Sequence, residues 1–156
     1  MAELQHPNPG VRFMHQRTDK KILVVDDEPD SRIFLSNLLY SDGFVPITAD
    51  NNTDGFRKAM DEKPAVIILN MMMPGETGIH MFRNLKRNEH LKHIPIIMLS
   101  TIDKQTFLKC HNLYGQLICE ATADKDAFIE KPPEADDLLI RVRELSGCRA
   151  GFSVEP

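Results

Sequence analysis

The sequence is most informative at Ala65-Val66-Ile67-Ile68-Leu69-Asn70-Met71-Met72-Met73-Pro74-Gly75. Five apolar residues, three of them β-branched, lead into one polar residue, Asn70, and a Pro-Gly pair follows shortly after it. Such a run is typical of a strand that is buried on both faces of a parallel sheet. Open α/β sheets bind their ligands at the carboxyl ends of their strands. We therefore expect this strand to carry Asn70 to a ligand-binding edge.

Four other apolar runs accompany this strand and alternate with helical patterns. Strict alternation predicts a parallel sheet with right-handed crossovers and helices on both faces. Pro46 lacks a backbone N–H, which favours a sheet edge for the second strand. The prediction is a flavodoxin-like, doubly wound α/β fold with five helices and five strands in the order 2-1-3-4-5. The other strands are expected at 22–25, 44–49, 96–99 and 127–130. The first helix is expected at 31–41, and the second runs from a cap at Asn52 to just before Pro64. The remaining helices are expected around 79–85, at 103–113 and at 134–146.

The chain has the size and composition of one ordinary globular domain. It holds 156 residues, of which 42% are hydrophobic and 27% charged, with a formal net charge of −4. An acidic chain without a basic stripe argues against direct nucleic-acid binding. No apolar run reaches membrane length, and the polar N-terminus does not resemble a signal peptide. Cys110, Cys119 and Cys148 show neither disulfide nor metal spacing, which predicts free thiols in a reducing cytoplasm.

Only the middle of the chain carries the periodic patterns of a folded domain. Residues 1–19 contain two prolines and a glycine with little periodicity, which predicts an irregular N-terminal arm. Residues 20–146 form the predicted domain, and 147–156 form a C-terminal tail. The segment 114–126 fits a helix extension, a loop or both.

Polar side chains end four of the five predicted strands. The first strand ends at Asp26 and Asp27, the third at Asn70, the fourth at Ser100 and the fifth at Lys131. In a 2-1-3-4-5 sheet these four strands are neighbours, so we expect the side chains to converge. Two adjacent carboxylates repel each other unless a cation joins them, and hard oxygen ligands suit Mg²⁺. A hydroxyl and an ammonium group opposite the acids would suit the oxygens of a phosphoryl group.

At these strand ends stand four motifs: Ile-Leu-Val-Val-Asp-Asp-Glu (22–28), Asn-Met-Met-Met-Pro-Gly-Glu-Thr-Gly (70–78), Met-Leu-Ser (98–100) and Phe-Ile-Glu-Lys-Pro (128–132). On these residues the chain resembles a receiver domain of the two-component response regulators, from about 20 to 146. The resemblance implies a signalling module and not an enzyme. It implies these roles: Asp26, Asp27, Asn70 and the Met72 backbone carbonyl as Mg²⁺ ligands, Ser100 as the switch hydroxyl, Lys131 as the phosphate-binding lysine, Phe128 as the aromatic switch, and Pro74 and Gly78 as shapers of the loop.

Asn70 departs from the family pattern, which has a phosphate-accepting aspartate at this position. A carboxylate can attack phosphorus, whereas a neutral amide is a poor nucleophile. The amide also removes one negative charge, which should weaken Mg²⁺ binding. This form should therefore not be phosphorylated. Two explanations stay open: a natural variant, or an engineered change that holds the domain in its unphosphorylated state.

The second departure is a long segment between Ser100 and Lys131, with the extra residues near 110–126. In the family, the fourth helix, the fifth strand and the last helix form the usual output and dimerisation face. An insertion there should alter the choice of partner, although a tolerated surface insertion explains it equally well. The resemblance implies a histidine kinase or phosphotransfer protein as donor, a downstream protein on this face, and leaves homodimerisation open.

Two functions are compatible with these observations. The first is a phosphorelay receiver whose phosphoacceptor position is blocked and whose output is docking onto another protein. The second is a natural pseudo-receiver that binds partners independently of phosphorylation. An enzyme on the same fold is disfavoured, because the sequence has no Walker loop, nucleotide fingerprint or Ser-His-Asp elbow.

Overall fold

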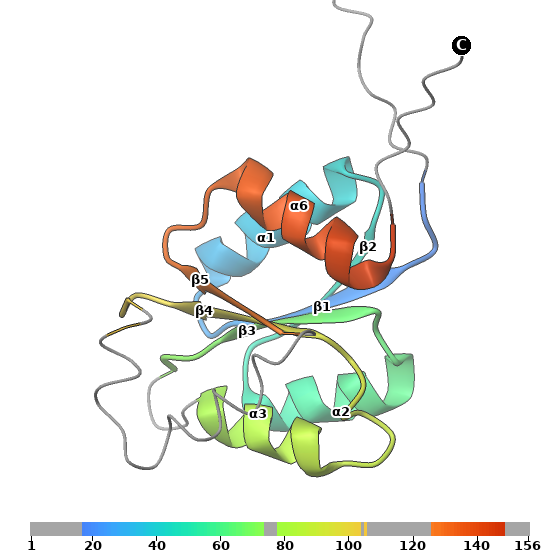
Figure 1. Cartoon of the computed structure of the whole chain (residues 1–156), viewed down its shortest axis with the longest axis vertical. Helices are drawn as coiled ribbons and strands as arrows, with labels where there is room; N and C mark the ends of the chain where they lie inside the picture. The colour runs from blue at the N-terminus through green and yellow to red at the C-terminus, as the bar shows by residue number, and fades with distance from the viewer. Residues whose placement is uncertain (1–16, 74–77, 104, 106–125, 149–156) are drawn as a thin grey trace, which may run out of the picture.

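The computed structural model describes residues 17–73, 78–103, 105 and 126–148. They form a five-stranded sheet in the order β2-β1-β3-β4-β5, and every pair of neighbours is parallel, as the sequence predicted (Figure 1). Pro46 lies in the edge strand β2, where its missing N–H disturbs no second neighbour. The strands are β1 (Lys21–Val25), β2 (Val45–Ala49), β3 (Val66–Asn70), β4 (Ile96–Ser100) and β5 (Ala127–Glu130).

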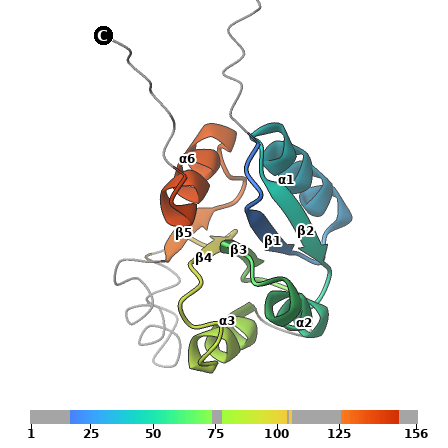
Figure 2. The same cartoon turned by 90° about the vertical axis from the view of Figure 1, so that its right-hand side faces the viewer.

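Helices cover both faces of this sheet. Figure 2 shows α1 and α6 on one side of the strands and α2 and α3 on the other. The described part of the chain contains four of the five predicted helices, because nearly all of 103–113 lies outside it. None of the described helices is long and apolar enough to cross a membrane. Their bounds are α1 (Pro29–Ser41), α2 (Asn52–Glu62), α3 (Gly78–Arg87) and α6 (Ala135–Ser146).

The helix ends follow local rules, but the predicted cap of α2 was wrong by one residue. Asn51, and not Asn52, is the N-cap of α2, because its side chain accepts a hydrogen bond from the Asp54 N–H at 2.8 Å. Gly147 ends α6 with a φ of 74°, in the left-handed region that glycine adopts without strain. These two residues therefore mark the start of α2 and the end of α6.

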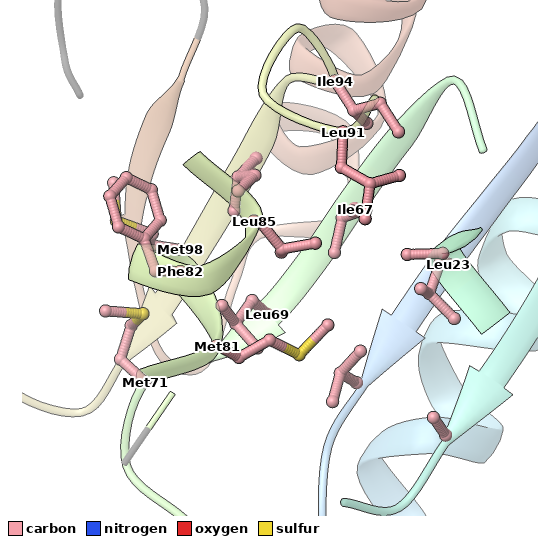
Figure 3. Close-up of a cluster of buried hydrophobic side chains, with 14 of the residues drawn as sticks. Leu23, Ile67, Leu69, Met71, Met81, Phe82, Leu85, Leu91, Ile94 and Met98 are labelled. Atoms are coloured by element: carbon pink, nitrogen blue, oxygen red, sulfur yellow. The ribbon is translucent and has the colours of Figure 1, made fainter. Parts of the chain in front are cut away.

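The core consists of two apolar layers, one on each face of the sheet. Side chains alternate along β1: Leu23 and Val25 pack toward α2 and α3, whereas Ile22 and Val24 pack toward α1 and α6. Figure 3 shows the first layer, in which Phe82 and its neighbours on α3 lie against β3 and β4. Every residue of β3 is buried, which agrees with the uninterrupted apolar run of its sequence. These layers fix the strands that carry the polar edge.

Strand register brings the polar residues to one edge. Asn70 pairs with Leu99, and Ser100 pairs with Glu130. The ladder continues past the strand ends, because the Met71 N–H donates to the Leu99 carbonyl at 2.9 Å and the Lys131 N–H donates to the Ser100 carbonyl at 2.8 Å. Residues that lie far apart in sequence therefore meet at the carboxyl edge.

Candidate functional site

Asp26 is the centre of the polar edge. It follows β1 directly, and only 1% of its surface is exposed. Its Oδ1 accepts hydrogen bonds from the Glu28 N–H at 3.0 Å and from Asn70 Nδ2 at 3.1 Å. Its Oδ2 accepts from Ser31 Oγ at 2.6 Å and from Lys131 Nζ at 3.1 Å. A carboxylate has about four lone-pair positions, so these donors satisfy a buried charge that would otherwise be very costly.

The donors around Asp26 favour its charged form. Burial by itself raises the pKa of this carboxyl group, but the hydrogen bonds from Ser31, the Glu28 N–H and Lys131, together with the charge of Lys131, outweigh it. The pKa of Asp26 is therefore below its ordinary value. This site is negatively charged at neutral pH.

Asn70 joins the two acids. Its side chain lies at the end of β3, is 3% exposed, and donates from Nδ2 to Oδ1 of both Asp26 and Asp27, each at 3.1 Å. Its Oδ1 accepts from the Met72 N–H at 3.2 Å. The opposite orientation of the amide would place its oxygen against two carboxylate oxygens, so the network defines which atom faces the acids. As expected from the strand order, Asn70 thus contacts both Asp26 and Asp27, and Lys131 also contacts Asp26.

Gly78 supports the backbone under Asn70. A Cβ atom at this position would lie 2.3 Å from the Asn70 carbonyl oxygen and 2.8 Å from Met71 Cα. Both of these atoms belong to the backbone and cannot turn away. The first residue of α3 therefore has to be glycine for the helix to start so close to the site. Pro74, also expected to shape this loop, lies outside the described residues.

Three further predicted site residues lie in β4, in β5 and directly after β5. Ser100 is fully buried, and its Oγ accepts from the Ile102 N–H at 3.0 Å. Lys131 reaches back across the sheet edge to Asp26, and its side chain is 14% exposed. Phe128 is partly buried and packs against the core layer between the sheet and α3. The Ser100 hydroxyl and the Lys131 ammonium group thus come from adjacent strands at the carboxyl edge, whereas Phe128 lies earlier along β5, opposite Met98.

The donor set at this edge fits a hard divalent cation in its chemistry. Within the described residues no three His, Cys, Asp or Glu side chains gather around one point, so a metal here would draw on amide and backbone oxygens besides the two acids. Oxygen ligands of this kind are those that Mg²⁺ takes. The Nδ2 group of Asn70 now lies between the acids, so a cation would have to displace it.

Two contacts of the site were not predicted from the sequence. Ser31, in the first turn of α1, binds the Asp26 carboxylate, and Arg32 donates from Nη1 to the Asp26 carbonyl at 2.8 Å. The predicted helix began at Ser31, whereas α1 begins at Pro29, which occupies the first helical position. The signal that could have revealed both contacts is the Pro29 helix start, which brings the next turn beside Asp26.

The chain is similar in sequence to a known family and to several known proteins. A family model described as the response regulator receiver domain matches residues 22–143. The phosphate regulon transcriptional regulatory protein PhoB of Pseudomonas aeruginosa is 41% identical over 124 residues, which is 80% of this chain and 50% of PhoB. Protein PilH of the same organism is 35% identical over 86 residues, which is 55% of this chain and 71% of PilH. This chain therefore spans about half the length of the PhoB regulator.

Solved structures agree with the sequence relatives. The chemotaxis protein CheY4 of Vibrio cholerae superposes with a TM-score of 0.69 at 25% identity, and the match covers 82% of this chain and 99% of CheY4. The receiver domain of a signal transduction histidine kinase from Syntrophus aciditrophicus has a TM-score of 0.67 at 28% identity, over 88% of this chain and 98% of that one.

Proposed function

Because this chain belongs to the response regulator receiver domain family, we propose that it is a phosphorelay signalling receiver held in its unphosphorylated state by Asn70. One observation carries this proposal: Asn70 Nδ2 donates to both Asp26 and Asp27 at 3.1 Å. An aspartate could not make these bonds, since it would bring a third negative charge against the pair. The amide therefore stabilises the acid pair in the resting arrangement.

The chemistry at position 70 supports the same conclusion. In an aspartate receiver, a carboxylate oxygen attacks phosphorus and forms an acyl phosphate while the donor leaves. The amide oxygen of Asn70 is neutral, and it already accepts a hydrogen bond from the Met72 N–H. The amide nitrogen has its lone pair in resonance with the carbonyl group. We therefore expect no phosphoryl transfer to this chain, although Ser100 and Lys131 remain in place to bind phosphoryl oxygens.

Magnesium belongs to the same proposal. Receiver domains generally bind Mg²⁺ at this acidic pocket, where the ion neutralises phosphoryl charge during transfer. In this chain the ligands would be Asp26, Asp27, the Asn70 side-chain oxygen and the Met72 backbone carbonyl. The set has one negative charge fewer than an aspartate site, and so its affinity should be weaker.

The output of the domain is docking onto another protein. The donor in the relay would be a histidine kinase or phosphotransfer protein, and the downstream partner would bind the face that includes β5 and α6. A homodimer through that face is a further outcome. We place this activity in the cytoplasm, without direct nucleic-acid or membrane binding. The cysteine spacing supports a reducing compartment, and among the described cysteines Cys148 is free.

A second function is favoured by the same amide. Since Asn70 Nδ2 donates to both acids, the domain would keep this arrangement without phosphate, as a natural pseudo-receiver requires. The two functions differ in what an aspartate at position 70 would do. In the first, Asn70→Asp restores a competent receiver, whereas in the second the remaining site residues no longer support transfer.

The experiment is incubation with phosphoramidate and Mg²⁺, followed by intact-mass measurement. We expect the native chain to gain nothing and Asn70→Asp to gain one acid-stable, base-labile phosphoryl group. Asn37→Asp, on the exposed surface of α1, is the matched control and should gain nothing. Phosphorylation of the native chain would contradict the proposal. Failure of Asn70→Asp, in a folded protein, would support the pseudo-receiver instead.

A further inference from the structure

The Ser31 hydroxyl makes the shortest of the four hydrogen bonds to the Asp26 carboxylate, at 2.6 Å, yet Ser31 belongs to none of the four motifs at the strand ends. We propose that Ser31 is a positioning residue for the metal site: it turns the Asp26 carboxylate so that Oδ1 faces the cation, and thereby strengthens Mg²⁺ binding. This inference depends on the proposed function, because it assigns Mg²⁺ to the same acid pair.

The geometry separates the two oxygens of Asp26. Oδ1 shares Asn70 Nδ2 with Oδ1 of Asp27, at 3.1 Å each, so these two oxygens converge on a common point. Oδ2 is held away from that point by Ser31 and Lys131. A carboxylate fixed through one oxygen presents the other in a constant direction. Ser31 therefore orients Asp26 Oδ1, which could bind a cation together with Oδ1 of Asp27.

The contact is not an ordinary helix cap. Glu28 is the N-cap of α1 and makes no side-chain capping bond, and Ser31 follows it by three residues. The Ser31 hydroxyl bonds outward to Asp26 rather than to its own helix. The next residue, Arg32, holds the Asp26 carbonyl at 2.8 Å. The first turn of α1 therefore donates hydrogen bonds to both the side chain and the backbone carbonyl of Asp26.

Lys131 alone would not fix this direction. Its ammonium group is a compact charge at the end of a flexible chain, and in the Asn70→Asp protein it would turn toward a phosphoryl group during transfer. When it turned, Ser31 would become the remaining donor on Oδ2 in the described structure. Hydrogen bonds to metal-binding carboxylates typically change affinity by about 10- to 100-fold. Ser31 is thus placed to keep Asp26 aligned when Lys131 is engaged elsewhere.

The test is calorimetric titration of Mg²⁺ into metal-free protein, in the native chain and in Asn70→Asp. In each background, Ser31→Ala should weaken Mg²⁺ binding by about 10-fold, and Ser31→Thr, which retains the hydroxyl group, should recover most of the affinity. Ser36→Ala is the matched control, because Ser36 lies on the same helix and its buried Oγ has no hydrogen-bond partner among the described residues. That control should leave the affinity unchanged.

Three outcomes would overturn the inference. One is an Mg²⁺ affinity of the Asn70→Asp protein that is the same with and without the Ser31→Ala substitution. Another is an equal loss in Ser31→Ala and Ser36→Ala, which would show a general effect on α1. A third is the absence of Mg²⁺ binding in both backgrounds. Failure of the proposed function would give a different result. In that case the Asn70→Asp protein would bind Mg²⁺ in a Ser31-dependent way and still gain no phosphoryl group.

Discussion

Helix α1 has a buried aspartate at each end, and the two are satisfied in different ways. Asp42, the C-cap residue, faces Arg143 of α6, whose Nε donates to Oδ2 at 2.7 Å and whose Nη2 donates to Oδ1. Asp26, before the helix, draws its four donors from a turn amide, α1, β3 and the segment after β5. Asp42 thus forms a bidentate ion pair with another helix, whereas Asp26 accepts hydrogen bonds from four separate groups.

The difference lies in the balance of charge. At Asp42, the guanidinium fork of Arg143 matches the carboxylate in both charge and shape. At the other end, Asp26 and Asp27 share one neutral amide, and within the described residues Lys131 is the one cation that contacts their carboxylates. The Asp42 pair therefore fastens α1 to α6, whereas the acid pair retains a negative charge that a cation can meet. Equal burial of an aspartate does not imply an equal role.

The largest expected effect breaks the Asp42 pair. Arg143→Met should lower the free energy of unfolding by about 3 kcal/mol, because it removes the guanidinium group that neutralises a buried carboxylate. Lys131→Met should cost clearly less, since Asp26 keeps three other donors. Urea denaturation measures both values.

The control for this prediction is on the same helix. Arg141 pairs with Glu144 on the exposed surface, so Arg141→Met should change stability by less than about 0.5 kcal/mol. The contrast between the two ends of α1 would be wrong if Lys131→Met proved as destabilising as Arg143→Met.

The next effect compares two glycines, one at each end of the fold. Gly78→Ala should lower the free energy of unfolding by about 2 kcal/mol, because the new Cβ would meet backbone atoms of Asn70 and Met71. Gly147→Ala should cost only about 1 kcal/mol, since the position is open but requires a positive φ. Equal losses, measured by thermal or urea unfolding, would show that α3 can move away from the site.

The smallest expected effect is a pH dependence at the site end. The pKa of Asp26 is lower in the folded chain than its ordinary value of about 3.9. Its contribution to stability is therefore complete above about pH 4 and is lost as the pH falls through the lower, folded value. Asp26→Asn should make stability fall less steeply in acid, and Ser31→Ala should do so partly. Superimposable acid profiles of the three proteins, followed by circular dichroism, would contradict this.

Much of the fold was predictable because its signals are local. The β-branched run before Asn70, the proline of β2 and the alternation of elements sufficed for the strand order. The convergence of Asp26, Asn70 and Lys131 followed from that order, since strand ends of a parallel sheet share one edge. Resemblance to a family added roles for these residues, which remain proposals.

The parts that escaped prediction depend on tertiary geometry. By residue type, either Asn51 or Asn52 could cap α2. Asn51 is the cap because its backbone is extended and its side chain reaches the Asp54 N–H. The Ser31 and Arg32 contacts require knowledge of where α1 starts relative to Asp26. Phe34 has the helical spacing of the apolar residues in α1, yet 48% of it is exposed, because the buried residues of this helix are Leu35 and Leu39. Periodicity indicates a face but not its edges.

The hydrogen bond between Met71 and Leu99, directly after β3, also affects the chemical stability of the Asn70 side chain. Asparagine is a thermolabile residue, and its usual decay begins when the nitrogen of the next residue attacks the side-chain carbonyl carbon. Here that nitrogen belongs to Met71 and is bound to the Leu99 carbonyl. The attack would require the ladder to open. Ageing of the folded protein should therefore not generate an aspartate at position 70, and the proposed unphosphorylated state would persist for as long as the sheet stays folded.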